Sequence, residues 1–181
     1  MAAIPATEAT PAFATLVRAV ADFPSPGIVF RDVMPLLADA GGFAAAIEAL
    51  AAPWRDAGIV AVAGVEARGF IFAAALARAL DAGFVPLRKP GKLPGALHEV
   101  EYALEYGRDR LQVQADALPA RTRVLLVDDV LATGGTLAAA ARLLGVLDVE
   151  LAGAAVLVEI EGLGGRARWP GPAPLVSVLR Y

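Results

Sequence analysis

A run of thirteen residues at positions 124–136 constrains the fold more than any other part of the chain. Its sequence is V-L-L-V-D-D-V-L-A-T-G-G-T. The four apolar residues at its start predict a strand buried on both faces, and the apolar spacing from Leu137 onward predicts a helix. Two carboxylates, Asp128 and Asp129, and a loop of small residues are therefore expected between a buried strand and a helix.

This order of elements predicts a ligand that carries both a phosphate and hydroxyl groups. Ligands of open parallel sheets bind beyond the carboxyl ends of the strands, and backbone N–H groups at a helix N-terminus attract anions. The carboxylates of Asp128 and Asp129 would repel a phosphate, but they suit hydroxyls or a hydrated divalent cation. A ribose 5-phosphate would satisfy both halves of the run. The alternative is that the aspartates only cap the helix, for which one aspartate would suffice.

Composition indicates one globular domain, residues 1–181, that acts on small molecules. The chain is 57% hydrophobic and 19% charged, which is enough for a core. It has no cysteine and one histidine, His98, which argues against disulfides and against thiolate or histidine metal sites. The net charge of -3 argues against nucleic-acid binding.

Two patterns favour a cytoplasmic location without a membrane partner. The first seventeen residues contain no Lys or Arg, which argues against a secretory signal. The longest run without charge covers twelve residues, 130–141, which is too short to span a bilayer.

Buried strands alternate with helices along the chain, which predicts an α/β fold with an open parallel sheet flanked by helices. Strands are expected at residues 59–65, 84–88, 111–115, 124–127, 151–160 and 175–179. Helices are expected at residues 13–21, 44–54 and 70–80, and from residue 137 onward. Residues 1–12, rich in Ala, Pro and Thr, are expected to form a flexible tail. Two prolines and a glycine impose an extended, turning path on residues 23–32.

Two further charged clusters follow predicted strands. The turn Glu66-Ala67-Arg68-Gly69 is either a helix start with an acidic cap or an anion site in which Arg68 pairs with a phosphate. Three cations after the next strand form either a solvated face or part of a ligand site at the sheet edge; they are Arg88, Lys89 and Lys92. The polar segment 93–107 is long for a connection, which predicts a lid.

Four motifs in order along the chain resemble the adenine phosphoribosyltransferases, which belong to the type I phosphoribosyltransferase family. The run at 124–136 is similar to that family's signature for phosphoribosyl pyrophosphate (PRPP). The other motifs are F-P-S-P-G-I-V-F-R-D at 23–32, G-V-E-A-R-G-F at 64–70, and R-K-P-G-K-L-P-G at 88–95 with L-E-Y-G at 104–107. The chain lacks both G-x-x-x-x-G-K-[ST] and G-x-G-x-x-G, so neither a P-loop nor a dinucleotide site is indicated.

The resemblance implies a fold and an activity. The fold is the type I phosphoribosyltransferase fold, with a small N-terminal hood over the base at about residues 23–35. The activity is purine salvage, in which the 5-phosphoribosyl group of PRPP is transferred to adenine to give AMP and pyrophosphate. Magnesium is the implied cofactor, held mainly by the substrate and reaching Asp128 or Asp129 through water. A homodimer is also implied, with residues near Arg88 reaching the interface.

The resemblance also implies a role for each group of site residues. Asp128 and Asp129 would hold the ribose hydroxyls. The 5-phosphate would be bound by Ala132, Thr133, Gly134, Gly135 and Thr136. The pyrophosphate would be bound by Glu66, Ala67, Arg68, Arg88, Lys89 and Lys92. Arg68 would also be catalytic, and a cis peptide is expected in its turn. Adenine would be bound by Val29, Phe30, Arg31 and Val130. Glu105 would manage the purine's proton, and Tyr106 would close the lid.

Two alternatives to this activity differ in class. One is a non-catalytic PRPP-sensing regulator, which would need an appended DNA-binding module or a basic face. The other is a phosphoribosyltransferase for hypoxanthine, guanine or xanthine, against which the hood motif argues. Backbone groups of the hood would complement adenine, and a 6-oxopurine would leave two of them unpaired. Each unpaired buried group costs roughly 1–3 kcal/mol, which amounts to discrimination of about 100-fold or more.

Overall fold

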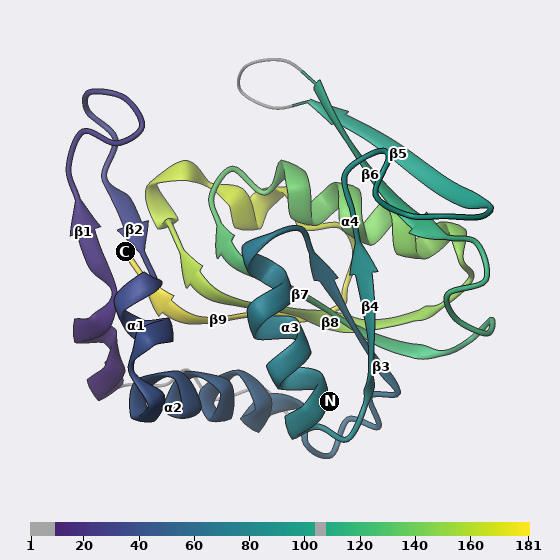
Figure 1. The fold of residues 1–181 in the computed structure, drawn as a ribbon, viewed down its shortest axis with the longest axis horizontal. Helices are drawn as coiled ribbons and strands as arrows, with labels where there is room; N and C mark the ends of the chain where they lie inside the picture. The colour runs from purple at the N-terminus through teal and green to yellow at the C-terminus, as the bar shows by residue number, and fades with distance from the viewer. Residues whose placement is uncertain (1–9, 104–107) are drawn as a thin grey trace.

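A five-stranded parallel sheet forms the centre of the computed structural model, which describes residues 10–103 and 108–181 (Figure 1). Neighbouring strands follow the order β4-β3-β7-β8-β9, and every neighbouring pair is parallel. The strands are β3 (Ala61–Val65), β4 (Gly83–Leu87), β7 (Arg123–Leu131), β8 (Glu150–Glu159) and β9 (Leu175–Arg180). The predicted α/β class and open parallel sheet are confirmed.

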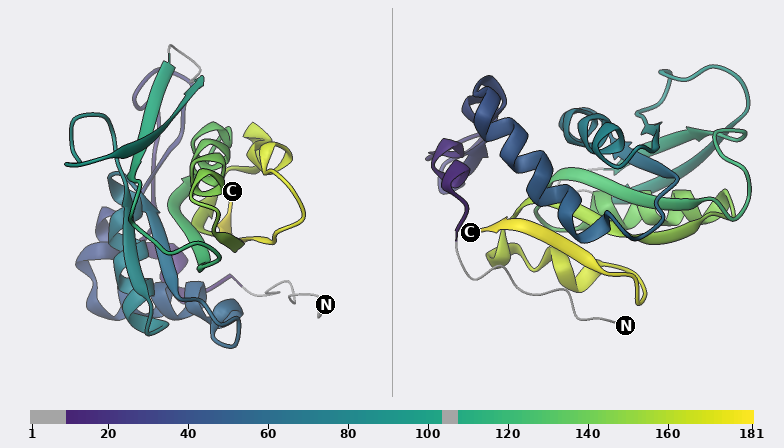
Figure 2. Two further views of the ribbon diagram at one scale, coloured as in Figure 1. Left: turned by 90° about the vertical axis from the view of Figure 1, so that its right-hand side faces the viewer. Right: turned by 90° about the horizontal axis from the view of Figure 1, so that it is seen from below.

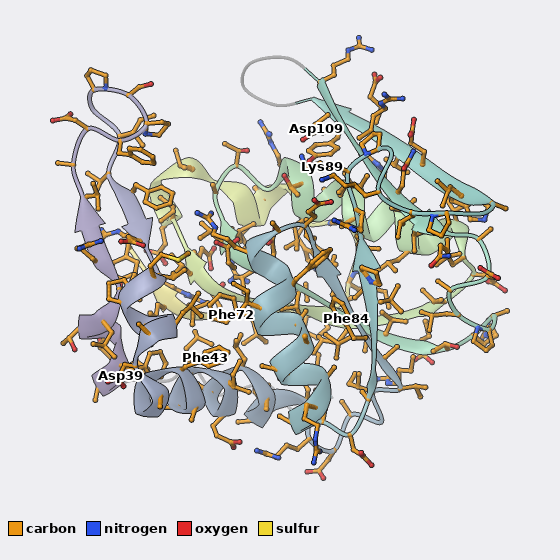
Figure 3. All side chains as sticks on the ribbon, viewed as in Figure 1. Asp39, Phe43, Phe72, Phe84, Lys89 and Asp109 are labelled. Carbon is orange, nitrogen blue, oxygen red and sulfur yellow. The ribbon has the colours of Figure 1, made fainter. Side chains whose placement is uncertain are left out.

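Helices cover both faces of this sheet, because successive strand residues point to opposite faces. Leu125 and Val127 of β7 pack with α2 (Ala40–Ala51) and α3 (Arg68–Ala79) in one hydrophobic core. Between these two helices the rings of Phe43 and Phe72 meet edge to face, with centroids 6.1 Å apart (Figure 3). On the opposite face, Val124 and Leu126 pack against α4 (Gly135–Val146) in a second core.

Two antiparallel ribbons stand outside the central sheet, at opposite sides of the molecule in Figure 1. The first, which is the predicted hood, pairs β1 (Arg18–Val20) with β2 (Phe30–Asp32). The second pairs β5 (Leu97–Ala103) with β6 (Arg108–Gln114), and Figure 2 shows it projecting beyond the helices. Short helical segments complete the chain: η1 (Ala12–Leu16), α1 (Met34–Ala38), η2 (Ala52–Trp54), η3 (Glu161–Leu163) and η4 (Gly165–Arg168).

Two local predictions are wrong, and a strand lies in a segment where none was predicted. The helix predicted at 13–21 is wrong, because a single 3-10 segment ends at Leu16 and Arg18–Val20 pairs with β2. Strand β7 does not end before the aspartates but continues through them to Leu131. Strand β5 lies inside the segment predicted as a lid. Residues 1–9 of the predicted tail lie outside the described residues.

Candidate active site

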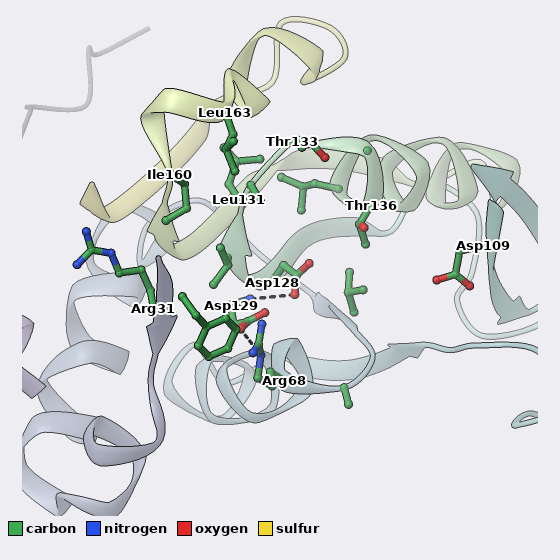
Figure 4. A pocket seen from close by; sticks show the side chains of 18 of the residues that line it. Arg31, Arg68, Asp109, Asp128, Asp129, Leu131, Thr133, Thr136, Ile160 and Leu163 are labelled. Atoms are coloured by element: carbon green, nitrogen blue, oxygen red, sulfur yellow. Dashed lines mark hydrogen bonds and ion pairs between the residues drawn. The ribbon is translucent and has the colours of Figure 1, made fainter. Parts of the chain in front are cut away.

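A cavity of about 610 Å³ lies where the sequence predicts a ligand, beyond the carboxyl ends of β3 and β7. Segments far apart in the sequence line it, including hood residues 28–31, the turn 65–68, residues 128–137 and part of the β5–β6 ribbon. Figure 4 shows side chains from these segments around the cavity. The structure thus brings the hood, the acidic pair and the small-residue loop together around one volume.

The two aspartates of β7 form a buried pair on the wall of this cavity. Asp128 is 9% exposed and Asp129 is 6% exposed. The Asp128 carboxylate accepts a hydrogen bond from the backbone N–H of Asp129, at 2.9 Å. Burial, reinforced by the neighbouring charge of Asp129, raises the pKa of Asp128 well above its ordinary value. The ligand-free site therefore holds a carboxylate charge at an energetic cost, which a donor or a cation would relieve.

Gly69 at the start of α3 makes room for the acidic pair. A Cβ atom at this position would lie 2.7 Å from Asp128 Oδ1 and 3.2 Å from Asp128 Cα. The absence of a side chain at Gly69 therefore allows α3 to approach β7 at the site. Any larger residue would push the Asp128 carboxylate out of place.

Arg68 lines the cavity beside the acidic pair. Its Nε atom is 2.6 Å from Asp129 Oδ2, a contact drawn in Figure 4. The N–H direction does not favour a hydrogen bond, and Asp129 Oδ2 is a buried oxygen without a hydrogen-bond donor. The same guanidinium lies 5.2 Å from the centroid of the Phe30 ring in the hood. Asp129 Oδ2 thus has a charge partner in Arg68 but receives no hydrogen bond.

The loop after β7 ends at the N-terminus of α4. Gly134 caps this helix with a φ of +80°, a left-handed conformation that suits glycine. The first N–H groups of α4 have no acceptor within the helix, so they attract an anion. Thr133 and Thr136 line the same part of the cavity (Figure 4), where their hydroxyls could add donors.

Glu66 contacts all three residues of the neighbouring cationic cluster, two through their charged groups and Lys89 through its backbone. Its carboxylate accepts a hydrogen bond from the backbone N–H of Lys89 at 2.8 Å and lies 3.3 Å from Arg88 Nε. Lys92 Nζ is 3.9 Å away. Burial alone would raise the pKa of Glu66, but these donors and charges outweigh it and lower that pKa. The expected cis peptide is present between Glu66 and Ala67.

The β5–β6 ribbon contributes a group that the sequence analysis missed. Asp109 forms an ion pair with Lys89, and it accepts a hydrogen bond from the Tyr102 hydroxyl at 3.2 Å (Figure 3). Asp109, Tyr102 and Lys89 all line the cavity. In β5, the exposed Glu99 and Glu101 alternate with the inward-facing Val100 and Tyr102. This alternation is the signal that could have predicted strand β5.

The hood is held over the cavity by contacts at both of its ends. The rings of Phe23 and Phe30 meet edge to face at 5.2 Å. Arg18 pairs with Asp32 at 2.5 Å across the ribbon. The guanidinium of Arg31 lies 3.8 Å from the centroid of the Tyr181 ring. Residues 28–31 of the hood line the cavity.

Most predicted site residues line this one cavity, and the others fall into two groups. The cavity-lining ones are Val29, Phe30, Arg31, Glu66, Ala67, Arg68, Lys89, Asp128, Asp129, Val130, Ala132, Thr133, Gly134, Gly135 and Thr136. Arg88 and Lys92 are near it through Glu66 but do not line it. Glu105 and Tyr106 lie outside the described residues. Apolar lining from Leu131, Ile160 and Leu163 was not foreseen.

The acidic pair is the only carboxylate pair on β7, and it does not form a complete metal site. In the described part of the chain, no three His, Cys, Asp or Glu residues cluster closely enough to hold a metal ion. The paired carboxylates of Asp128 and Asp129, which line the cavity, nevertheless suit a hydrated cation whose remaining ligands come from a bound substrate. Across the same residues, no helix is long and apolar enough to cross a membrane.

Comparison with known proteins agrees with this geometry. Residues 36–170 match the phosphoribosyl transferase domain family. The chain is 58% identical to the adenine phosphoribosyltransferase of Xanthomonas axonopodis pv. citri, over 91% of this chain and 89% of that relative. The crystal structure of adenine phosphoribosyltransferase from Rhodothermus marinus is 46% identical with a TM-score of 0.87, covering 92% of this chain and 95% of that one. The enzyme from Saccharomyces cerevisiae, crystallised with adenine and an imino-altritol bisphosphate, is 38% identical with a TM-score of 0.86, covering 92% and 98%.

Proposed function

We propose a residue-level mechanism from the premise that this chain belongs to the adenine phosphoribosyltransferases. The reaction is purine salvage: the 5-phosphoribosyl group of PRPP passes to adenine, giving AMP and pyrophosphate. One observation carries the assignment of residues. The buried acidic pair, an unfilled helix N-terminus and the hood face a single cavity of about 610 Å³.

Asp128 and Asp129 hold the ribose hydroxyls in this proposal. The support is that Asp129 Oδ2 is buried without a donor and that the pKa of Asp128 is raised by burial and by its neighbour. Two hydroxyl donors would satisfy both carboxylates. As the bond between C1′ and the pyrophosphate oxygen lengthens, the ribose gains positive character, which nearby carboxylates stabilise.

The 5-phosphate binds to residues 132–136 at the N-terminus of α4. Free N–H groups and the helix dipole favour an anion there, and the hydroxyls of Thr133 and Thr136 supply further donors. The loop at residues 132–136 consists of Ala, Thr and Gly, so it contains no carboxylate that would repel the phosphate. The phosphate is thus separated by the length of the ribose from the two aspartates.

The pyrophosphate binds between the turn at Arg68 and the cation at Lys89. Guanidinium pairs with phosphate oxygens in bidentate fashion. Glu66 does not suit direct contact with an anion, because its carboxylate already binds Arg88 and the backbone of Lys89. We therefore assign Glu66, Arg88 and Lys92 to the positioning of this cationic wall, with Ala67 contributing backbone.

Adenine binds beneath the hood, in the cavity that Phe30 and Val130 both line. Backbone groups of Val29 and Arg31 read the base edge. The nitrogen N9 attacks C1′ from the face opposite the departing pyrophosphate. Glu105 manages the purine's proton and Tyr106 closes the site, which excludes water that would hydrolyse PRPP. Both residues lie outside the described part of the chain, so these two roles rest on the motif L-E-Y-G at 104–107.

A magnesium ion, a homodimer and a cytoplasmic location complete the proposal. Asp128 and Asp129 would contact the hydrated ion, which when bound would offset the negative charge of the pyrophosphate. Large apolar side chains on α3 and β4, Ile71 at 40% and Phe84 at 37% exposed, suit burial against a second copy. Mass measurement by light scattering would test the dimer, and a monomer at micromolar concentration would overturn it.

Turnover with alternative bases tests the proposed adenine pocket. The purified chain with Mg²⁺ and PRPP should convert adenine to AMP, and should discriminate against hypoxanthine by about 100-fold or more in kcat/KM. Formation of IMP from hypoxanthine without AMP from adenine would overturn the base assignment. Binding of PRPP without turnover of any base would favour the regulator.

A further inference from the structure

An ion cluster centred on a buried carboxylate lies behind the active-site loop rather than in the cavity. Its centre is Glu159, the last residue of β8, which is 5% exposed. The Glu159 carboxylate accepts two hydrogen bonds from Arg166, from Nε at 2.9 Å and from Nη2 at 2.5 Å. It also accepts one from the Ser177 hydroxyl at 2.5 Å. Neither Glu159 nor Arg166 lines the cavity, so the mechanism above does not use them.

Arg166 donates two further hydrogen bonds, both to residues of β9. Nη1 donates to the backbone carbonyl of Leu175 at 2.7 Å, and Nη2 contacts Ser177 Oγ at 2.8 Å. The Arg166 guanidinium therefore connects segment η4 to the last residue of β8 and to the start of β9. Burial alone would raise the pKa of Glu159, but the bonds from Arg166 and Ser177 outweigh it and lower that pKa. The carboxylate is thus an anion that fixes Arg166 in one orientation.

Gly165, which precedes Arg166, contacts the backbone of the phosphate loop. A Cβ atom at Gly165 would lie 2.1 Å from the carbonyl oxygen of Ala132 and 3.0 Å from the backbone nitrogen of Gly134. A Cβ atom at Gly134 would lie 2.4 Å from the carbonyl oxygen of Gly165. The two backbones therefore meet without room for one methyl group between them. Segment η4 forms a wall behind residues 132–134.

We propose that the Glu159–Arg166 pair positions the 5-phosphate loop through Gly165, with Arg166 as a positioning residue. Segment η4 has only four residues, too few to be rigid on its own. The fork of Arg166 supplies the missing rigidity, and the glycine contact transmits it to the loop. Loop N–H groups bind a phosphate well only when they are held in place. The inference rests on the assignment of residues 132–136 to the 5-phosphate.

The test compares Arg166→Lys with Arg180→Lys. Both arginines approach Glu159, but Arg180 does so at 3.6 Å from β9 and does not neighbour Gly165. We expect Arg166→Lys to raise KM for PRPP and Kd for AMP by roughly 10-fold to 100-fold, with KM for adenine within about twofold. Arg180→Lys should leave all three constants near those of the wild type. Gly165→Ala should reproduce the effect of Arg166→Lys.

The outcomes separate the inference from the proposed function. In the proposed function, the hydroxyls of Thr133 and Thr136 contact the phosphate directly. Unchanged AMP affinity in the double variant Thr133→Ala with Thr136→Ala would therefore overturn the loop assignment itself. If that variant weakens AMP but Arg166→Lys does not, the positioning role is wrong. Equal losses for adenine and PRPP, or equal effects of Arg166→Lys and Arg180→Lys, would also reject it. Should Arg166→Lys not fold, Ser177→Ala removes one bond of the same cluster and should shift KM for PRPP in the same direction.

Discussion

Arg68 Nε lies 2.6 Å from Asp129 Oδ2, yet that buried oxygen receives no hydrogen bond. The cation assigned to pyrophosphate therefore lies beside a carboxylate assigned to the ribose. Binding of PRPP would offer each of them a better partner: phosphate oxygens for Arg68 and a hydroxyl donor for Asp129. The two ends of the substrate would thus be bound together.

Replacement of Arg68 tests this coupling. Arg68→Ala removes the bidentate donor and leaves Asp129 without its charge partner, so we expect kcat/KM for PRPP to fall about 10²-fold to 10³-fold. The fold should persist, since Arg68 is at the solvent-facing start of α3. Arg78→Ala, on the exposed side of the same helix, is the control and should behave as the wild type. Steady-state assays of both variants would decide, and an active Arg68→Ala would remove the role.

Asp128 gives the ligand-free protein a distinct dependence on pH. Its pKa is raised in the folded state by burial and by Asp129, so its contribution to stability is present below about pH 4 and is lost as pH rises through the folded pKa. Asp128→Asn removes the ionisable carboxyl, so the variant does not lose this stability as pH rises. We expect the variant to melt about 2–4 °C above the wild type at pH 8 and at the same temperature near pH 3.5. A lower melting temperature at pH 8 would contradict the raised pKa.

The same aspartates should be indispensable for substrate. Asp128→Asn combined with Asp129→Asn is expected to weaken PRPP binding by about 100-fold or more, because two charged hydrogen-bond acceptors are lost. Circular dichroism should report an intact fold. Unchanged PRPP affinity, measured by titration calorimetry, would exclude the hydroxyl role.

Glu66 should matter for stability as well as for substrate. Its lowered pKa means that its contribution to stability is present above about pH 4.5 and is lost as pH falls through the folded pKa. We expect Glu66→Gln to lower the free energy of unfolding by about 1–3 kcal/mol at pH 7 and by less near pH 3.5. Glu48→Gln breaks an exposed pair with Arg55 and should cost under about 1 kcal/mol. If Glu66 were only a surface charge, urea titrations would show equal losses in the free energy of unfolding for Glu66→Gln and Glu48→Gln.

Close approach of α3 to β7 can be tested with two glycines. Gly69→Ala places a methyl group against Asp128 Oδ1, so we expect kcat/KM for PRPP to fall at least about tenfold. Gly145→Ala on α4 meets no atom within 4 Å and should stabilise the protein by about 0.5–1 kcal/mol. A fully active Gly69→Ala would show that Asp128 tolerates displacement.

The lid acid can be tested by kinetics alone. Glu105→Ala should lower kcat far more than it changes KM for PRPP, because proton transfer belongs to the chemical step. Equal losses in both constants would indicate that Glu105 positions the substrate instead.

Local patterns predicted the central sheet because its strands are mostly apolar runs, and two of them, β3 and β7, are followed by helical spacing. They failed for residues 13–21, where pairing with β2 at positions 30–32 overrides the local helical pattern. The end of β7 was placed too early because charged residues usually end a strand, whereas Asp128 stays in the ladder beside Val156 of β8.

For the site, the sequence motifs located most of the lining residues but not their partners. Asp109 reaches Lys89 across twenty positions, and Gly165 reaches Ala132 from a different crossover. Such contacts depend on how elements pack, which no local spacing encodes. The sequence shows a buried strand that ends in Glu159 and is followed by Gly165 and Arg166. The role of these residues depends on η4 packing behind residues 132–134, which the sequence does not show.

A crystal structure with AMP bound is the most direct test of the central claim. We predict the 5-phosphate on the N–H groups and hydroxyls of residues 132–136, the ribose hydroxyls on Asp128 and Asp129, and the base beneath Phe30. Occupation of another part of the molecule by the nucleotide, with this cavity unchanged, would contradict the assignment of the site.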